Sequence, residues 1–403
     1  MQKSEPKEGY EYDASKRALA SRYESVKLRL GFIDGTLVPI AFSLILLFSG
    51  ASTQLSRLLS TTVSSYWVSL GFYLIIFIVL LTVVEAPFSF YSGFIVDHRF
   101  SLSTQNVKGW FLDEVKGLGV EVVFAVLAGA ILYYLIRTTP LWWIVAAVIF
   151  AAFSIFLSTI LPYVILPIFY KVTPISDEQL KAELVQMSER MGVKNIDRVL
   201  VADESSKSVR ANAFFSGVGK SKAIVLFDTL LNNFTRREIA TVVAHELGHY
   251  VNKDIWKEAA TSGLFLIPPF FIADYALRAG SSSLGFTGIA DPAGIPLIIT
   301  VLIGMNFALQ PFTNGIARLV ERRADEFGLR AANDPTAQAS AERRLADLSL
   351  SVDTPNKLVE YLFYTHPPSS KRIQLAERWR ETEANPESLQ KSKYTSASPA
   401  NQP

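Results

Sequence analysis

Residues 66 to 86 read YWVSLGFYLIIFIVLLTVVEA, an apolar run whose single charged residue, Glu85, stands next to its end. As a helix, this run is about 30 Å long, which is the thickness of the hydrocarbon core of a bilayer. A helix also satisfies its own backbone polar groups, as lipid demands. The sequence therefore predicts a mainly α, polytopic helical membrane protein with six spans, or seven. The other five apolar runs lie at residues 31–50, 119–136, 141–165, 259–278 and 293–312.

The composition agrees with a membrane protein and removes several kinds of chemistry. Half of the 403 residues are hydrophobic and 19% are charged, which is unusual for a soluble globule of this size. The net charge is only +2 and the sequence has no long Lys/Arg block that could bind nucleic acid, so we expect no nucleic-acid partner. The chain has no cysteine, so any metal must use histidine and carboxylate ligands. The polar first thirty residues lack the pattern of a cleavable signal peptide.

Basic residues set the expected orientation in the membrane. The segment before the first span is rich in Lys and Arg, which favours the cytoplasmic side. Six spans threaded from there place the polar segments 87–118 and 166–258, and everything after 313, on that same side. We therefore expect a multi-pass protein with its chemistry facing the cytoplasm, in a prokaryotic plasma membrane or, for a eukaryotic protein, in the ER membrane. The basic residues are Lys3, Lys7, Lys16, Arg17, Arg22, Lys27 and Arg29.

The spans divide the chain into six predicted segments. The cytoplasmic tail (1–30) precedes a four-span region (31–165), an α+β module (166–258), two further spans (259–312), cytoplasmic helices (313–380) and a disordered tail (381–403).

The α+β module has its own pattern. We expect an amphipathic helix over 176–191 and strands over 198–202, 211–215 and 223–227. Thr235 with Glu238 three residues later is a capping-box signal, which predicts a helix from there through His249.

That last helix carries the sequence His245-Glu246-Leu247-Gly248-His249, an HExxH motif in a chain with only four histidines. Residues four apart share a helix face, so both imidazoles can bind one tetrahedral zinc ion. Glu246 is then placed to act as general base on a zinc-activated water. A solvated helix face is the alternative, but the apolar residues before the motif favour burial.

A catalytic zinc needs a third protein ligand. A polar stripe at helical spacing begins inside the sixth apolar run and continues beyond it, so one continuous helix is predicted. On it, Glu321 is our third zinc ligand, and Asp325, one turn later, can accept an imidazole N–H and fix its tautomer. Surface ion pairing is the alternative for the stripe. Its members are Asn306, Gln310, Asn314, Arg318, Glu321 and Asp325.

Other residues are candidates for binding the substrate. His366 precedes two prolines that fix the backbone, so it could donate to the oxyanion of a tetrahedral intermediate. A loop histidine bonded to nearby backbone is the alternative. The run that contains Asn212 and Ala213 could form an edge strand that pairs with an extended peptide, or an ordinary internal strand. We predict that Asn314, Arg318 and Arg372 also bind substrate, and that His98 is structural.

The chain resembles the type I CAAX prenyl endopeptidases, which are multi-spanning zinc metalloproteases of the gluzincin type, and its Arg210-Ala211-Asn212-Ala213 is similar to prokaryotic members. The resemblance implies a helical barrel around a water-filled chamber, with zinc at its cytoplasmic rim and cleavage near the substrate C-terminus. It covers about residues 30 to 380. The matching features are Pro87-Phe88-Ser89-Phe90-Tyr91, Leu161-Pro162, Asn212-Ala213, the HExxH, the Glu321/Asp325 helix and His366-Pro367-Pro368.

We therefore predict a membrane zinc metalloendopeptidase with one Zn²⁺ per chain, which cleaves near the C-terminus of membrane-associated polypeptides, prenylated CAAX proteins among the candidates. The partners are a peptide or protein substrate and the bilayer; the sequence does not define an oligomeric state. Two alternatives stay open. The polar stripe could line the path of a transporter or channel, and the protein could be an inactive scaffold of protease descent.

Overall fold

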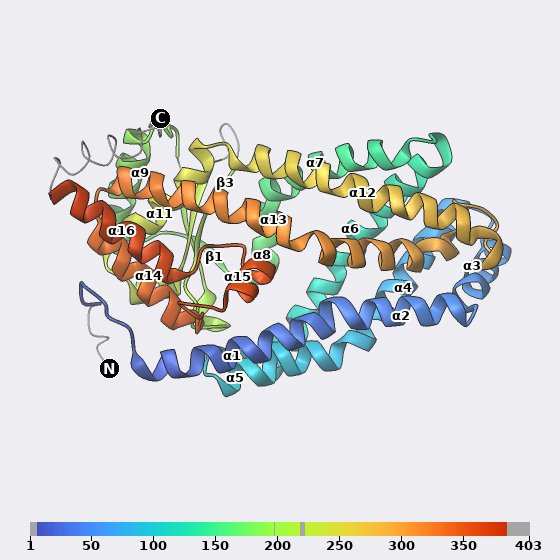
Figure 1. Cartoon of the computed structure of the whole chain (residues 1–403), viewed down its shortest axis with the longest axis horizontal. Coiled ribbons are helices and arrows are strands. Elements are labelled where there is room, and N and C mark those ends of the chain that lie inside the picture. The colour runs from blue at the N-terminus through green and yellow to red at the C-terminus, as the bar shows by residue number, and fades with distance from the viewer. Residues whose placement is uncertain (1–5, 197, 218–221, 385–403) are drawn as a thin grey trace, which may run out of the picture.

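A computed structural model describes residues 6–384 except 197 and 218–221. Figure 1 shows an elongated molecule in which long helices run along the long axis, while a small sheet and several shorter helices gather at one end. Among the described residues, six helices are long and apolar enough to cross a membrane, which confirms the six predicted spans. They are Ala14–Phe48, Tyr66–Arg99, Val107–Thr138, Trp142–Phe169, Asp254–Ser283 and Pro292–Ala332.

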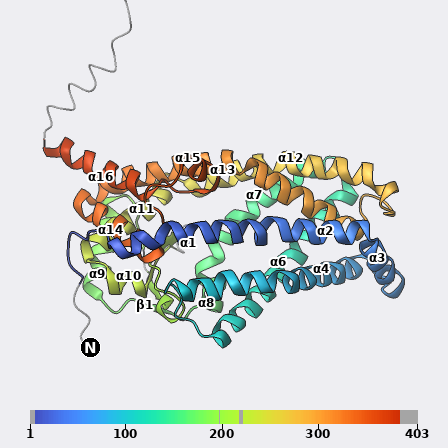
Figure 2. The ribbon, with the colours of Figure 1, turned by 60° about the horizontal axis from the view of Figure 1, so that its bottom comes forward.

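These helices are longer than the apolar runs that predicted them. The first, in blue in Figure 2, consists of α1 (Ala14–Phe32), a π-helical turn (Ile33–Leu37) and α2 (Val38–Phe48). The predicted polar tail 1–30 is therefore helical from Ala14, because the Asp13 carboxylate caps the helix by accepting from two backbone N–H groups. The others are α4 (Tyr66–Ser89) with its extension to Arg99 through α5 (Asp97–Arg99), α6 (Val107–Thr138), α7 (Trp142–Ile160) continuing through α8 (Leu166–Phe169), α12 (Asp254–Ser283) and α13 (Ile295–Ala332).

The short helix α3 (Ala51–Thr62) closes the end of the molecule that is farthest from the sheet (Figure 1). Large buried aromatic residues fill the core near it, and their polar atoms have partners, as low-dielectric surroundings require. Trp142 Nε1 donates to Asp274 at 2.7 Å, and Tyr73 shares a hydrogen bond of 2.7 Å with Ser52 of α3. These contacts hold the helices together at the end opposite to the sheet.

The sheet has four strands in the order β1-β2-β4-β3. β2 (Arg198–Ala202) and β4 (Ala223–Phe227) are parallel and match the predicted strands. β3 (Ala213–Ser216) begins two residues later than predicted and pairs antiparallel with β4, so it forms an edge of the sheet. β1 (Val172–Pro174) was not predicted, because three residues ending in proline carry no period-two pattern.

Helices cover the sheet and complete the module. The Thr235–Glu238 capping box is present and starts α11 (Arg236–Val251), as predicted. The predicted helix 176–191 is present as α9 (Glu178–Arg190). The last helix continues to Ala384, so the first four residues of the predicted tail 381–403 are helical, and 385–403 lie outside the described residues. The remaining helices are α10 (Asp228–Asn233), α14 (Pro335–Ser349), α15 (Lys357–Phe363) and α16 (Ser369–Ala384).

Candidate metal centre

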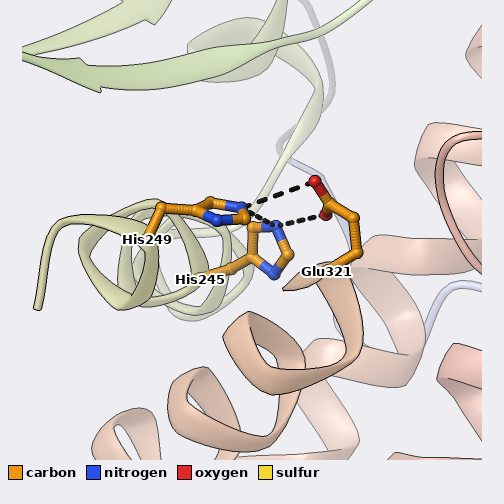
Figure 3. Close-up of side chains that lie close together, drawn as sticks. All are labelled: His245, His249 and Glu321. Atoms are coloured by element: carbon orange, nitrogen blue, oxygen red, sulfur yellow. Dashed lines mark hydrogen bonds and ion pairs between the residues drawn. The ribbon is translucent and has the colours of Figure 1, made fainter. Parts of the chain in front are cut away.

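Three side chains from two helices converge at the end of the molecule that holds the sheet. His245 and His249 project from α11 and Glu321 from α13 (Figure 3). The two Nε2 atoms lie 3.2 Å apart, and Glu321 oxygens lie 3.3 Å from His245 Nε2 and 3.6 Å from His249 Nε2. Among the described residues, this is the one group of three or more His or carboxylate side chains whose ligand atoms cluster tightly enough to hold a metal ion.

Two glycines let the helices approach closely enough for this convergence. Glu321 follows His249 by 72 residues (321 − 249), so the contact depends on the crossing of α11 and α13. A Cβ atom on Gly328 would lie 3.2 Å from the backbone nitrogen of His245, and one on Gly248 would lie 3.3 Å from the backbone of Ala324. Both distances are tighter than ordinary van der Waals contact. Glycine at these two positions therefore sets the separation of the two helices.

Each histidine is oriented by a buried carboxylate. Asp325 Oδ1 lies 2.9 Å from His245 Nδ1, the contact that the sequence predicted, and Asp254 Oδ2 lies 3.1 Å from His249 Nδ1. A ring that donates through Nδ1 directs the lone pair of Nε2 toward the centre of the cluster. Asp254 was not predicted. Its carboxylate is buried, and it follows Lys253, whose backbone φ of 57° is left-handed.

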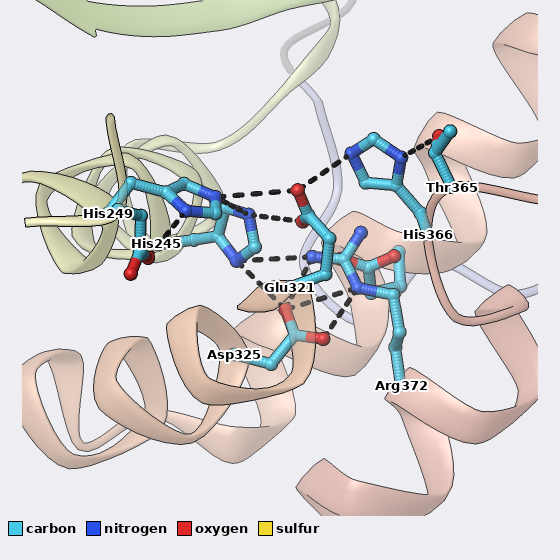
Figure 4. Close-up of polar contacts among 9 residues, drawn as sticks. His245, His249, Glu321, Asp325, Thr365, His366 and Arg372 are labelled. Carbon is cyan, nitrogen blue, oxygen red and sulfur yellow. Dashed lines mark hydrogen bonds and ion pairs between the residues drawn. The ribbon is translucent and has the colours of Figure 1, made fainter. Parts of the chain in front are cut away.

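A buried ion-pair network stands behind His245 (Figure 4). The guanidinium of Arg372 donates to both oxygens of Asp325, through Nε at 2.9 Å and Nη2 at 2.5 Å, and its Nη1 lies 3.0 Å from Glu342 on α14. Arg372 was predicted to bind substrate, but its donors face these two carboxylates. Glu342 was not predicted; burial raises the pKa of its carboxyl group to about 7, although Arg372 lowers it.

His366 lies on the opposite side of Glu321 from His249 (Figure 4). Its Nε2 is 3.3 Å from Glu321 Oε1, its Nδ1 is 2.9 Å from the Thr365 hydroxyl, and 58% of its side chain is exposed. This places an exposed imidazole beside the cluster, and its contact with a reacting carbonyl stays a prediction.

Asn314 and Arg318 of α13 donate hydrogen bonds to backbone carbonyls of the segment 360–364. The Asn314 amide donates to the carbonyl of Leu362 at 2.6 Å, and Arg318 Nη1 donates to the carbonyls of Glu360 and Tyr364. They therefore hold the backbone that leads to His366, and their contact with substrate stays a prediction. His98, which was predicted to be structural, has its Nδ1 2.7 Å from the carbonyl oxygen of Phe94.

Glu246 stands between two cavities that meet at the metal centre. A cavity of about 120 Å³ is lined by Asn212, His245, Glu246 and His366, among others. A larger cavity of about 920 Å³ is lined by Phe215, Ser216, Glu246, His249 and Glu321, among others. The edge strand β3 therefore runs from the smaller cavity to the larger one, past the carboxylate. Burial raises the pKa of Glu246, while the neighbouring imidazolium charges lower it.

Two protein-family models each match about half of the chain. The model of peptidase family M48 matches residues 174–380, which contain every residue of the cluster. The chain belongs to peptidase family M48. The model described as the CAAX prenyl protease N-terminal region, with five membrane helices, matches residues 4–171. That range holds four of the six candidate spans together with the short helix α3. The family and the helices together make the chain a multi-pass membrane metalloprotease.

Known proteins are similar to this chain over most of its length. This M48 peptidase is 29% identical to the uncharacterized metalloprotease YhfN of Bacillus subtilis, over 90% of this chain and 86% of the relative. It is 31% identical to CAAX prenyl protease 1 of Saccharomyces cerevisiae, over 72% of this chain and 68% of that protein. The crystal structure of Ste24p from S. mikatae matches with a TM-score of 0.76 and 25% identity, covering 90% of this chain and 88% of that one. The predicted family and fold class are thereby confirmed.

The helix crossing makes a first prediction for this M48 peptidase. Gly328→Ala places a methyl group against the backbone of His245 and should destabilise the protein by about 1 to 3 kcal/mol, as overpacking does. It should also lower metal affinity, because the shift separates Glu321 from the histidines. Gly304→Ala is the matched control, since it lies on the same helix with nothing within 4 Å of its built Cβ. Thermal unfolding and metal titration of the two variants in detergent measure the difference; equal behaviour would contradict the close crossing.

Protonation of the histidines makes a second prediction. Burial lowers the pKa of His245, but Asp325 and Glu321 outweigh burial and raise it to about 10 in the metal-free protein. The pKa of His249 is also raised, since Glu321 outweighs burial. The His245 ring is therefore protonated at pH 7.5 and must lose a proton to bind a metal. Metal binding should release at least one proton, and affinity should rise with pH. Calorimetric titration in two buffers of different ionisation enthalpy measures this; an identical heat in both would refute it.

Proposed function

We propose that this chain is a zinc-dependent endopeptidase in which His245, His249 and Glu321 hold the metal. The spacing of the three side chains carries the proposal. Zinc bonds of about 2.0 to 2.2 Å at tetrahedral angles separate two ligand atoms by about 3.3 to 3.6 Å. The two Nε2 atoms lie 3.2 Å apart, and one ligand atom from each of the three residues lies within 4.8 Å of the other two. Glu321 Oε2 is also buried, and the ion pair that it makes is with His245 Nε2, another of the proposed ligand atoms.

The donor set favours zinc over other metals. Two imidazoles and one carboxylate, with an open fourth position, are typical of a catalytic zinc, whereas calcium and magnesium prefer oxygen ligands throughout. When bound, zinc supplies a Lewis acid that acidifies a water molecule and polarises the substrate carbonyl. Asp325 and Asp254 keep both Nε2 atoms free for the metal by accepting the Nδ1 protons.

Glu246 is the proposed general base. It takes a proton from the attacking water and returns it to the leaving amine, and a pKa raised by burial brings its carboxylate closer to the pH at which it works. His366, exposed beside Glu321, is placed to donate a hydrogen bond to the carbonyl oxygen as negative charge develops there. Arg372 positions Asp325, and through it His245.

The substrate is a peptide in an extended conformation. The free edge of β3 can add a substrate strand that runs past Glu246 and between the two cavities, with Asn212 and Ala213 at its beginning. By similarity to the yeast CAAX prenyl protease 1, we propose membrane-associated polypeptides cleaved near their C-terminus, prenylated CAAX proteins among them. The Lys/Arg-rich N-terminal helix lies at the same end as the metal centre, which supports a cytoplasmic active site.

Glu246→Gln tests the proposed function. The amide has nearly the same shape but cannot take a proton, so the variant should keep one zinc per chain and lose peptide hydrolysis by about 100-fold or more. Zinc analysis by mass spectrometry and cleavage of a farnesylated CAAX peptide in detergent measure both. Glu189→Gln, at an exposed position of α9, is the matched control and should behave as wild type. Hydrolysis by Glu246→Gln at the wild-type rate would rule out this mechanism, and bound zinc without activity in the wild type would favour an inactive scaffold.

A further inference from the structure

The end of the sixth span that leads to the metal centre borders a basic surface that the proposed chemistry does not use. The apolar part of α13 begins at Ile295, and twenty helical residues cover about 30 Å, so the hydrocarbon region ends near Asn314. Arg318 follows about 6 Å further along the axis, within the headgroup layer. Its Nη1 donates to two carbonyls of the segment 360–364, which ties α15 to this turn of α13. Figures 1 and 2 both show α15 beside α13, so α15 lies at the level of the membrane surface.

A cleft at this level gathers basic side chains from α13, α15 and the start of α16. One cavity of about 390 Å³ is lined by Arg318, Lys357 and Lys371, and among the described residues its one acidic side chain is Glu360. A neighbouring cavity of about 440 Å³ shares Arg318, Glu360 and Lys371 with it. We call the two cavities together the Lys357 cleft. The second cavity adds the exposed cations Arg322 and Arg378.

The Lys357 cleft carries an excess of positive charge. Glu360 pairs with Lys371 at 2.5 Å, and the Asp325 carboxylate, which lines the second cavity, pairs with Arg372. Both acidic groups of the lining are therefore already neutralised. Across the part of the chain that the structure describes, three other cations of the cleft form no ion pair with a carboxylate. An anionic ligand would balance their charge. These cations are Arg318, Lys357 and Arg378.

Exposed apolar side chains lie next to these charges. On α13, Phe312, Ile316 and Leu319 stand four and three residues apart, so they share a helix face, and Leu319 also lines the cleft. This stripe leads from the span to the basic residues. On α15, Leu358 is 63% exposed, and the exposed Tyr361 lines the cleft. Tyrosine and the long basic side chains are the residues that anchor proteins at a membrane interface. The combination favours a lipid over a soluble anion, which would not contact the apolar residues.

We propose that the Lys357 cleft binds the phosphate group of an anionic phospholipid, with the acyl chains along the apolar stripe of α13. Lysine and arginine donate charge-assisted hydrogen bonds to a phosphodiester, and a basic pocket at the end of a membrane helix favours anionic headgroups. A zwitterionic lipid carries a cation of its own, which these residues repel. A bound headgroup would join α13 to α15, next to the loop that leads to His366. The proposal goes beyond the peptidase activity and does not depend on it.

Native mass spectrometry of the full-length protein in detergent tests the site by counting bound lipids. The probe is dioctanoyl phosphatidylglycerol, and dioctanoyl phosphatidylcholine is the zwitterionic reference. The wild type should bind the anionic lipid about fivefold more tightly or better. Lys357→Gln/Lys371→Gln removes two cations of the cleft and should weaken phosphatidylglycerol binding by roughly 25-fold, at about fivefold for each cation. Its binding of phosphatidylcholine should stay that of the wild type.

Lys181→Gln/Lys194→Gln is the matched control. It removes the same charge from α9 and the residues that follow it, at the end of the molecule that holds the sheet (Figure 1). Lys181 pairs with Glu178 at 3.0 Å, as Lys371 pairs with Glu360, so each double variant loses one ion pair. The control should bind phosphatidylglycerol as the wild type does. All three proteins should melt at the same temperature, because surface substitutions change stability little.

Lys357→Gln alone keeps the test valid if the double variant melts early, since the exposed Lys357 has no ion pair to lose among the described residues. This variant should weaken phosphatidylglycerol binding by about fivefold. Equal binding of the two lipids by the wild type would overturn the proposal, and so would an undiminished preference for phosphatidylglycerol in both cleft variants. Displacement of the lipid by inorganic phosphate at equal concentration would also overturn it, because the cleft would then hold a free anion.

Discussion

The crossing of α11 and α13 is the contact on which the rest of the structure depends. Gly248 and Gly328 bring the two helix backbones together, and this approach places Glu321 beside two histidines that precede it by more than seventy residues. Because α13 is one continuous helix from the membrane span to Ala332, the position of Glu321 is set by the packing of the spans as well as by the sheet module. The membrane region and the candidate metal centre therefore share one helix, so a shift in the packing of the spans would also move Glu321.

Burial of charge explains why the centre is surrounded by so many ionisable groups. Two imidazoles and a carboxylate taken out of water are costly unless each is paired. Asp325, Arg372 and Glu342 form an alternating chain of charges behind His245, and it reaches α14. The same helix contacts the start of α11, where Ser340 and Arg344 both donate to Glu238 of the capping box. α14 thus holds the beginning of α11 directly and reaches His245 through Arg372 and Asp325.

Local periodicity explains which features the sequence predicted. Apolar runs of about twenty residues, the capping box and the HExxH depend on neighbours within one or two helical turns, and so does the placement of Asp325 one turn after Glu321. Asp254 and Glu342 were missed, and the ion pairs of Arg372 were not predicted, because these contacts join separate elements. Arg372 meets Asp325 across 47 residues and His245 across 127, a pairing that no periodicity encodes. Likewise, the three residues of β1 form a strand only because β2 lies beside them.

The central claim is that a carboxylate beyond two membrane spans completes a zinc site begun on α11. X-ray absorption spectroscopy of the zinc-loaded protein, compared with Glu321→Ala, tests this directly. The account predicts two imidazole nitrogens at about 2.0 to 2.1 Å with carboxylate and water oxygens in the wild type. In Glu321→Ala, most zinc should be lost at equal protein concentration. A variant that retained one zinc per chain with an unchanged spectrum would contradict the account, because Glu321 would then not be a ligand.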